Sequence, residues 1–568
     1  MVRYVLPCLA ASLVLAACSP SAPPSAPEHG AAEVVAVPAS HGFGPEVSAE
    51  DFSVHVRTLA SDEFAGRAPG SAGEQLTVQY IQSQFERLGL KPGNGDSYLQ
   101  TVPMVESEVD PSAHLAMQVK GEALDFAFGS DMVIGSRTEQ ATVAIENSPL
   151  VFVGYGVNAP EQGWNDYAGL DVKGKTVVML VNDPGFHAGD ETLFDGKRMT
   201  YYGRWTYKFE EAARQGASAA LIIHDDAGAG YGWAVVQNSW SGKQFDLPRT
   251  VDTEPRSPAQ GWLTGDAAKR LFAAAGLDLD ALRTAANQRG FKAVPLDATL
   301  TTALDTRLQQ TQSHNVLGLL PGSTRPDESV VYMAHWDHLG THEGEAGDNI
   351  YNGAIDNASG VAGILEIAEA FVTQNPAPER SVLFLAVTLE ESGLLGSRYY
   401  TAQPVLPLAK TAAVINLDAM PVLGPTRDMV VIGKGNSELE DLLAEIAGKQ
   451  GRTLVAEDAP EKGYYFRSDH FNFAKAGVPA LYAKGGTDNI EHGKEFVVQA
   501  TQDYLLNRYH KPADAFDPNW DLRGVVQDIN ALYAVGRVIA GSGQWPNWYE
   551  GNAFRAAREL GEAERATP

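Results

Sequence analysis

The feature that most constrains this chain is a nearly continuous apolar run, Ser381 to Thr388, that ends at the acidic pair Glu390-Glu391. A run without polar alternation predicts a strand buried on both faces, which occurs mainly in parallel sheets covered by helices. Carboxylates buried at the end of such a strand are costly unless a partner compensates their charge. The run therefore predicts both a fold class and a polar site.

The same order of strand, loop and helix recurs from Gln312 onward. The further strand candidates are Val330–Ala334, Ala412–Leu417 and Val478–Ala483, and the helix candidates are Val361–Val372 and Ser437–Lys449. Asp356 to Gly360 is expected to be a loop whose polar side chains cap the first of these helices. This alternation predicts an α/β fold with a mainly parallel mixed sheet flanked by helices. Upstream, Gly73 to Leu88 has the apolar spacing of another helix, and the loop before it, Glu63 to Arg67, is turn-like.

Residues 108–308 have a different sequence pattern. They contain the short β-rich runs Leu150–Gly154, Thr176–Val181 and Ala219–Ile223, and one helical segment, Lys208–Gln215. We expect a small β-rich domain with a few helices.

The first residues read as a targeting segment. Residues 1–17 have a short basic start and an apolar stretch, as in a secretory signal peptide. Cys18 follows Leu15-Ala16-Ala17, which resembles the bacterial lipoprotein cleavage box, and the alternative is an ordinary signal site with a chance cysteine. Residues 18–46 are rich in Pro, Ala and Ser and suit a flexible tether. We expect an exported protein, lipid-anchored at Cys18 in the bacterial envelope at the outer membrane.

Composition excludes some partners. The chain has 43 Lys and Arg against 71 Asp and Glu, a formal net charge of −28, which argues against nucleic acid as a partner. No interior run is apolar for the roughly 20 residues that a spanning helix needs, so we expect membrane contact only through the N-terminal lipid anchor. The sequence says nothing about the oligomeric state.

Potential metal ligands gather where the predicted strands end. They are His335, Asp356, Glu390, Glu391, Asp418 and, further along, His510. In open α/β sheets, ligands bind beyond the carboxyl ends of the strands. Imidazoles with carboxylates and no thiolate suit zinc, and the set is too large for one tetrahedral ion with an open position. It fits two ions that share one carboxylate. Taken singly, each residue is as well explained by hydrogen bonding, solvation or helix capping.

Six short motifs, all in the same order, resemble the M28 family of zinc peptidases. They are Ala334-His335-Trp336-Asp337, Gly353 to Gly360, Leu389 to Gly393, Asn416-Leu417-Asp418, Arg467-Ser468-Asp469-His470 and Tyr509 to Asp514. The resemblance covers residues 50–105 and 310–540, and implies a zinc-exopeptidase-like catalytic domain (a phosphorylase/hydrolase-like α/β fold) formed by residues 47–107 and 309–542. Residues 108–308 would be an insert containing a protease-associated (PA) domain at about 145–262, with 543–568 as a C-terminal tail.

The resemblance implies two zinc ions and assigns their ligands. Asp356 would bridge both ions, His335 and Asp418 would complete one site, and Glu391 and His510 would complete the other. His338, His342 and His470 are left out of the metal set, because loop hydrogen bonding or packing explains them better.

The catalytic roles follow from the same resemblance. Asp337 would orient His335, and Glu390 would be the general base. Tyr465 has the spacing of an oxyanion-stabilising tyrosine, with the adjacent Tyr464 as the alternative. The implied function is an aminopeptidase that hydrolyses N-terminal residues from peptides by a metal-bridged hydroxide.

Three alternatives stay open at this point. A carboxypeptidase of the same family would need a cationic cluster, for which Arg467, Lys462 and Lys484 are candidates, although Arg467 to His470 is more like the aminopeptidase branch. A glutaminyl cyclase shares the fold with a single zinc, and the inserted domain argues against it. A non-catalytic binding lipoprotein would be expected to have lost ligands, and none is missing.

Overall fold

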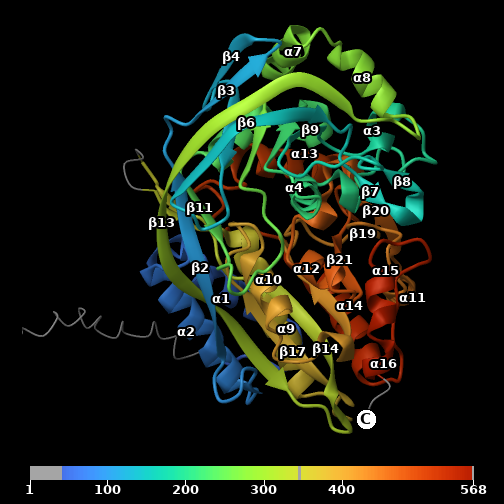
Figure 1. The fold of residues 1–568 in the computed structure, drawn as a ribbon. Helices are drawn as coiled ribbons and strands as arrows, with labels where there is room; N and C mark the ends of the chain where they lie inside the picture. The colour runs from blue at the N-terminus through green and yellow to red at the C-terminus, as the bar shows by residue number, and fades with distance from the viewer. Residues whose placement is uncertain (1–40, 343–346, 566–568) are drawn as a thin grey trace, which may run out of the picture.

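The computed structural model describes residues 41–342 and 347–565 (Figure 1). The predicted signal peptide, Cys18 and most of the predicted tether lie outside the described residues. Within them, no helix combines the length and the apolar character needed to cross a membrane.

The larger sheet is mixed and mainly parallel, as predicted. Its central strands run in the order β13, β17, β14, β18, β21, and every pairing from β17 to β21 is parallel. β13 pairs with β17 antiparallel, and at the other edge β21 pairs antiparallel with β19, which is parallel to β20. The bounds are β13 Val294–Leu320, β17 Arg380–Val387, β14 Arg325–His335, β18 Thr411–Asn416, β21 Ala480–Gly485, β19 Asp428–Val431 and β20 Thr453–Ala456.

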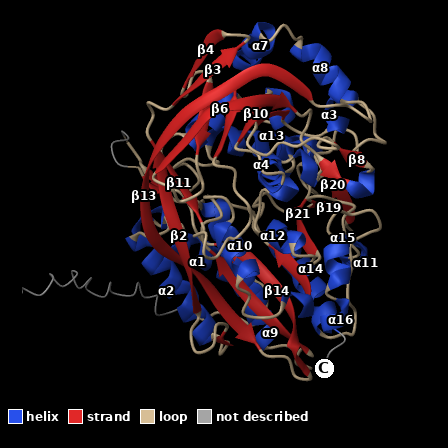
Figure 2. Cartoon of the chain, in the orientation of Figure 1, coloured by secondary structure: helices blue, strands red, loops and turns tan. Residues whose placement is uncertain are grey.

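Helices cover both faces of this sheet (Figure 2). Successive residues of β14 alternate between two hydrophobic clusters: Tyr332 packs in one and Met333 in the other. The first cluster involves α1 Ala49–Leu59, α2 Ala72–Arg87, α9 Ser359–Val372, α11 Leu439–Lys449 and α14 Arg523–Ala540. The second involves α10 Leu395–Ala402 and α12 His470–Lys475. The remaining helices of this region are α13 Gly493–Asn507, α15 Arg555–Leu560 and α16 Glu562–Arg565. Burial on both faces explains why the central strands lack polar alternation.

The middle of the chain builds a second sheet with its own hydrophobic clusters. Four of its strands, β6, β9, β10 and β12, are parallel, and β3, β4 and β5 complete it with antiparallel pairings. The strands are β3 His114–Val119, β4 Glu122–Ala127, β5 Met132–Gly135, β6 Thr142–Phe152, β9 Thr176–Leu180, β10 Ala219–Ile223 and β12 Ala259–Leu263. The helices are α3 Pro184–Ala188, α4 Trp205–Arg214, α5 Asp226–Ala229, α6 Trp233–Trp240, α7 Gly265–Ala274 and α8 Leu279–Ala286.

One long strand joins the two sheets, and the sequence did not reveal it. β13 has 27 residues: its first part pairs with β3 and β6, and its last part with β17. β2, Leu99–Val109, runs antiparallel along its middle, and β11, Lys243–Asp246, pairs with β2. Figure 1 shows β13 arching from the upper sheet to the lower one. The domain boundaries placed at 107/108 and 308/309 therefore fall inside β2 and β13.

Two local expectations were wrong. The segment expected as a turn at Glu63 to Arg67 belongs to a short 3-10 helix, Asp62–Arg67, which is interrupted by left-handed backbone at Ala65 and Gly66. The expected loop before α9 is a helical turn, Ala354–Ala358, kinked at Asp356 and Asn357. In it, Asn357 Oδ1 accepts the N–H of Gly360 at 2.8 Å.

Arg67 ties this N-terminal segment to the connection between β14 and α9. It is 1% exposed, and its guanidinium donates hydrogen bonds to the carbonyl oxygens of Leu59, Trp336, Asn352 and Gly353 at 2.6 to 2.8 Å. The N-terminal segment that contains Arg67 therefore helps to hold the connection that follows β14 in place.

We expect Arg67→Met to lower the free energy of unfolding by about 3–5 kcal/mol, because four buried carbonyls lose a charged donor. Urea denaturation of the full chain measures this. Arg307→Met is the matched control: its side chain is 81% exposed, and we expect a change below about 1 kcal/mol. Equal losses in the two variants would contradict the role given to Arg67.

Candidate metal centre

Three neighbouring parallel strands deliver polar side chains to one edge of the sheet. β14 ends at His335, β17 leads into Glu390 and Glu391, and β18 leads into Asp418. Asp356 lies on the kinked turn before α9, and His510 follows α13 with a left-handed φ of 55°. The expected convergence at the carboxyl ends of the strands is thus present in the structure.

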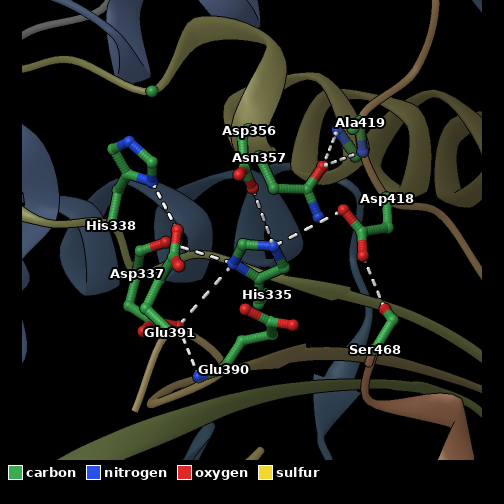
Figure 3. A network of polar contacts seen from close by, with 12 residues as sticks. His335, Asp337, His338, Asp356, Asn357, Glu390, Glu391, Asp418, Ala419 and Ser468 are labelled. Atoms are coloured by element: carbon green, nitrogen blue, oxygen red, sulfur yellow. Dashed lines mark hydrogen bonds and ion pairs between the residues drawn. The ribbon is translucent and has the colours of Figure 1, made fainter. Parts of the chain in front are cut away.

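The carboxylate of Asp356 lies between two imidazoles. Its Oδ1 is 3.2 Å from His335 Nε2, and its Oδ2 is 3.2 Å from His510 Nε2. Asp418 Oδ1 lies 3.6 Å from His335 Nε2, and Glu391 Oε2 lies 3.2 Å from His510 Nε2. Figure 3 shows His335 facing Asp356 and Asp418. The five residues predicted as metal ligands are therefore brought together in two sets that share Asp356.

Asp337 and Glu390 both border this centre. His335 Nδ1 is 3.1 Å from the backbone oxygen of Asp337 and 3.8 Å from its Oδ1, so the closer contact is with the backbone. Asp337 Oδ1 accepts the N–H of Glu390 at 3.1 Å, which links the ends of β14 and β17. A carboxylate oxygen of Glu390 lies within 4.8 Å of ligand atoms of both His335 and Asp418.

His338 is a member of the site that the sequence analysis left out. It is 1% exposed, its Nδ1 is 2.6 Å from Glu391 Oε1, and it forms a compact group with Asp356 and Glu391. Its ring centroid lies 5.6 Å from that of His510, so two imidazoles face the same pair of carboxylates. The available signal was its position three residues after His335, just past a strand end.

The structure does not bring Tyr465 into contact with the carboxylates. Its side chain is buried against His470, with ring centroids 4.6 Å apart, and its hydroxyl has no hydrogen-bond partner among the described residues. Burial raises its pKa, and the charges that act on it are Glu440 and Arg198, which lie outside the site. Two other tyrosines adjoin the ligands: Tyr482 donates to the backbone oxygen of Asp418 at 3.1 Å, and the Tyr509 ring stacks on His510 at 3.9 Å.

Polar neighbours hold the acids in place. Ser468 Oγ donates to Asp418 Oδ2 at 2.6 Å, and Asp514 accepts the backbone N–H groups of Ile355 and Asp356 at 3.0 and 3.1 Å. Asn357 Oδ1 also accepts the N–H of Ala419 at 3.2 Å, which ties the Asp356 turn to the Asp418 loop. The Asp418 carboxylate and the backbone of the Asp356 turn are therefore positioned from outside the centre.

The concentration of carboxylates in this centre favours bound cations. Burial raises the pKa of Glu390 well above its usual range, and burial raises that of Asp337 to about 7. Burial alone would lower the pKa of His335, but Glu390, Asp356 and Asp418 raise it well above its usual range. Likewise, Glu391 and Asp356 outweigh burial and raise the pKa of His510 to about 10.

The donor set fits metal ions. His510 Nε2 is 3.2 Å from two carboxylates yet makes no hydrogen bond to either, an arrangement that suits ligands converging on a common ion. Imidazole nitrogens and carboxylate oxygens without thiolate match zinc. The strand-end site of an α/β sheet together with this donor set defines the class: an α/β domain with a candidate metal centre.

Part of the chain is similar to known peptidases. Residues 315–534 match the model of Peptidase family M28. Over 129 residues the chain is 33% identical to Aminopeptidase NAALADL1 of Mus musculus. The aligned segment covers 22% of this chain and 16% of the mouse protein. Over 130 residues it is 38% identical to a probable zinc metalloprotease of Pyrenophora teres f. teres, covering 22% and 23%.

These matches have limited extent. The chain spans less than a quarter of the length of either relative. Among solved structures, an aminopeptidase from Aneurinibacillus sp. strain AM-1 superposes over 88% of this chain and 96% of its own, with 20% identity and a TM-score of 0.47.

The charge balance of the centre makes a prediction about metal loss. Without metal, the raised pKa values of His335 and His510 contribute stability that is fully present below about pH 6.5 and is lost as the pH rises through the folded values. Zinc requires neutral imidazoles, so the zinc-loaded protein has no such loss. We expect the difference in free energy of unfolding between zinc-loaded and metal-free protein to widen from about pH 7 to about pH 9. Urea denaturation of both forms measures this difference. A difference that shrinks over this pH range would contradict the proposed role of His335 and His510 as zinc ligands.

Proposed function

We propose that the chain is a di-zinc aminopeptidase that releases N-terminal residues from peptides. The observation that carries the proposal is the carboxylate of Asp356, whose two oxygens each lie 3.2 Å from a different imidazole. A carboxylate presented to two ligand sets is what a pair of ions sharing one bridge requires. A single tetrahedral ion leaves half of these ligands unexplained.

Each proposed ion has its own residues. His335 and Asp418 would hold one, Glu391 and His510 would hold the other, and Asp356 would contact both. His338 is placed to bind the second ion or to orient Glu391 through the 2.6 Å contact. When bound, zinc supplies Lewis acidity, which polarises a peptide carbonyl and allows water to lose a proton near neutral pH.

Glu390 is placed to carry that proton. It is partly buried, it lies beside His335 and Asp418, and burial raises its pKa well above its usual range. The positive charge of bound ions would bring this pKa back down, toward the value at which a carboxylate both takes and returns a proton. Glu390 would take the proton from water and deliver it to the leaving amine.

Surplus negative charge supports the preference for N-termini. The buried and partly buried acids in and around the centre are Asp337, Asp356, Glu390, Glu391, Asp418 and Asp469. Two dications compensate four negative charges, and the rest favours a substrate ammonium group. The mouse relative carries the name aminopeptidase, whereas a Caenorhabditis briggsae relative, 32% identical over 126 residues, is named a glutamate carboxypeptidase 2 homolog.

The export signal, the lipid anchor and the protease-associated domain are proposed from the sequence alone. We propose export and lipid anchoring in the bacterial envelope through Cys18, and a protease-associated domain within the inserted region.

The function is tested with matched peptides that differ only in N-terminal acetylation. We expect the zinc-loaded protein to hydrolyse the free peptides at least 100-fold faster than the acetylated ones, because the ammonium group is blocked. Glu390→Gln should keep its zinc and lose about 100-fold or more of this activity. Liquid chromatography of the products and metal analysis measure both effects. Cleavage of acetylated peptides from the C-terminus would favour a carboxypeptidase, and wild-type rates in Glu390→Gln would exclude Glu390 as the base.

A further inference from the structure

The turn that carries the proposed base begins at a residue with an unusual backbone. Leu389, directly before Glu390, has a left-handed φ of 57° and is fully buried. This conformation is unfavourable for a leucine and persists only where the surrounding structure holds it in place. The position of Glu390 therefore depends on the residues that pack around Leu389.

Hydrogen bonds fix the backbone of this turn. Asn315 Oδ1, from β13, accepts the N–H of Thr388 at 3.1 Å. The backbone oxygen of Leu389 accepts the N–H of Leu395 at 3.0 Å, which joins the turn to the start of α10. These bonds hold the chain before and after Glu390, and the side chain of Leu389 takes no part in them.

The insert contributes to the packing around that side chain. Leu247, in the loop after β11, is 1% exposed and belongs to a small hydrophobic cluster. Phe245 and Val251, also from the insert, pack against the same cluster. Because β11 pairs with β2, the loop lies beside it (Figure 1). The other buried members of the cluster are Val102, Met104, Leu389 and Leu395.

An ion pair attaches the same loop to the helix that follows the turn. Asp252 is 5% exposed, and its carboxylate lies 2.7 Å from Arg398 Nη2 of α10. The N–H of Asp252 donates to the backbone oxygen of Pro248 at 2.9 Å, which closes the loop between Leu247 and Asp252. The loop is thus attached to the catalytic region at both of its ends.

We propose that the insert loop formed by residues 247–252 positions Glu390 for catalysis, with Leu247 as the main positioning residue. The inference rests on the proposed peptidase function, in which Glu390 is the general base. If packing is removed around Leu389, its unfavourable backbone can relax, and the carboxylate that follows moves with it. A displacement of about 1 Å can lower a rate about 100-fold. The insert would thereby act on the catalytic step.

The first test truncates Leu247 in the zinc-loaded full-length protein. Leu247→Ala should lower kcat about 10- to 100-fold, with KM within about twofold of wild type, because Glu390 is displaced and substrate contacts are kept. Its zinc content should stay at the wild-type value. Leu247→Met nearly conserves the buried volume and should restore most of kcat. Steady-state kinetics on an unblocked peptide and metal analysis measure these effects.

Leu300→Ala is the matched control. Leu300 is fully buried in a hydrophobic cluster of the inserted sheet, and this cluster contains no residue of the Glu390 turn. The truncation leaves a comparable cavity, so it should lower the melting temperature about as much as Leu247→Ala does. We expect its kcat to stay within about twofold of wild type, because the Glu390 turn keeps its packing.

Arg398→Met tests the second attachment without a cavity in the core. Arg256, from the insert, still pairs with Asp252 in this variant, so only the link to α10 is lost. We expect kcat to fall about threefold or more, again with little change in KM. Lys475→Met is its control: it removes another ion pair between the two regions, from Lys475 Nζ to Glu210 Oε1 at 2.9 Å, and should leave kcat unchanged.

Each outcome decides the proposal. Wild-type kcat in folded Leu247→Ala, a rise in KM alone, or equal losses of kcat in the two leucine-to-alanine variants overturns it. A loss of zinc that matches the loss of kcat also overturns it, because the loop would then act on metal binding. If Leu247→Ala does not fold, Arg398→Met decides, and a wild-type kcat in that variant overturns the proposal.

Hydrogen exchange separates this proposal from the proposed function. If the wild type hydrolyses no peptide, the proposed function fails, and the positioning is then tested on the amides of residues 388–396 in the zinc-loaded protein. Their exchange should be about tenfold or more faster in Leu247→Ala than in the wild type, and unchanged in Leu300→Ala. Unchanged exchange in Leu247→Ala would overturn the positioning role.

Discussion

The structure depends on a concentration of buried acids at one edge of a sheet. Asp356 is buried and Glu391 and Asp418 are partly buried, in surroundings where isolated carboxylates are unfavourable, and two imidazoles reach them from different elements. Their compensation by cations accounts for the surrounding organisation: Ser468, Asn357 and Asp514 fix the loops, and Arg67 ties the N-terminal segment to them. The fold supplies the rigidity that holds like charges together.

The second organising feature is the continuous strand β13, which belongs to both sheets. A shared strand makes the inserted region an extension of the catalytic scaffold, so its residues are held in fixed relation to the metal centre.

Much of this arrangement was predictable, and the failures have physical causes. Buried strands such as β17 are recognisable in the sequence because they contain an uninterrupted apolar stretch, here Val382 to Val387. The acids that follow such a strand can then be placed at its carboxyl end. The continuous strand β13 was not predicted because its middle, Gln309 to Ser313, is polar. This part pairs with β2 through backbone hydrogen bonds, which require no apolar pattern in the sequence. His338 was not predicted because the sequence alone cannot distinguish a metal-site histidine near a strand end from one that packs or forms hydrogen bonds.

The central claim is that Asp356 joins two metal sites, and zinc stoichiometry tests it most directly. Inductively coupled plasma mass spectrometry of the purified full chain, after removal of loosely bound metal, should give two zinc ions per chain in the wild type. Asp356→Ala should reduce the content of both sites to well below one ion per chain, because each site loses a ligand. A wild-type value of one, or an Asp356→Ala variant that retains two ions, would contradict the account.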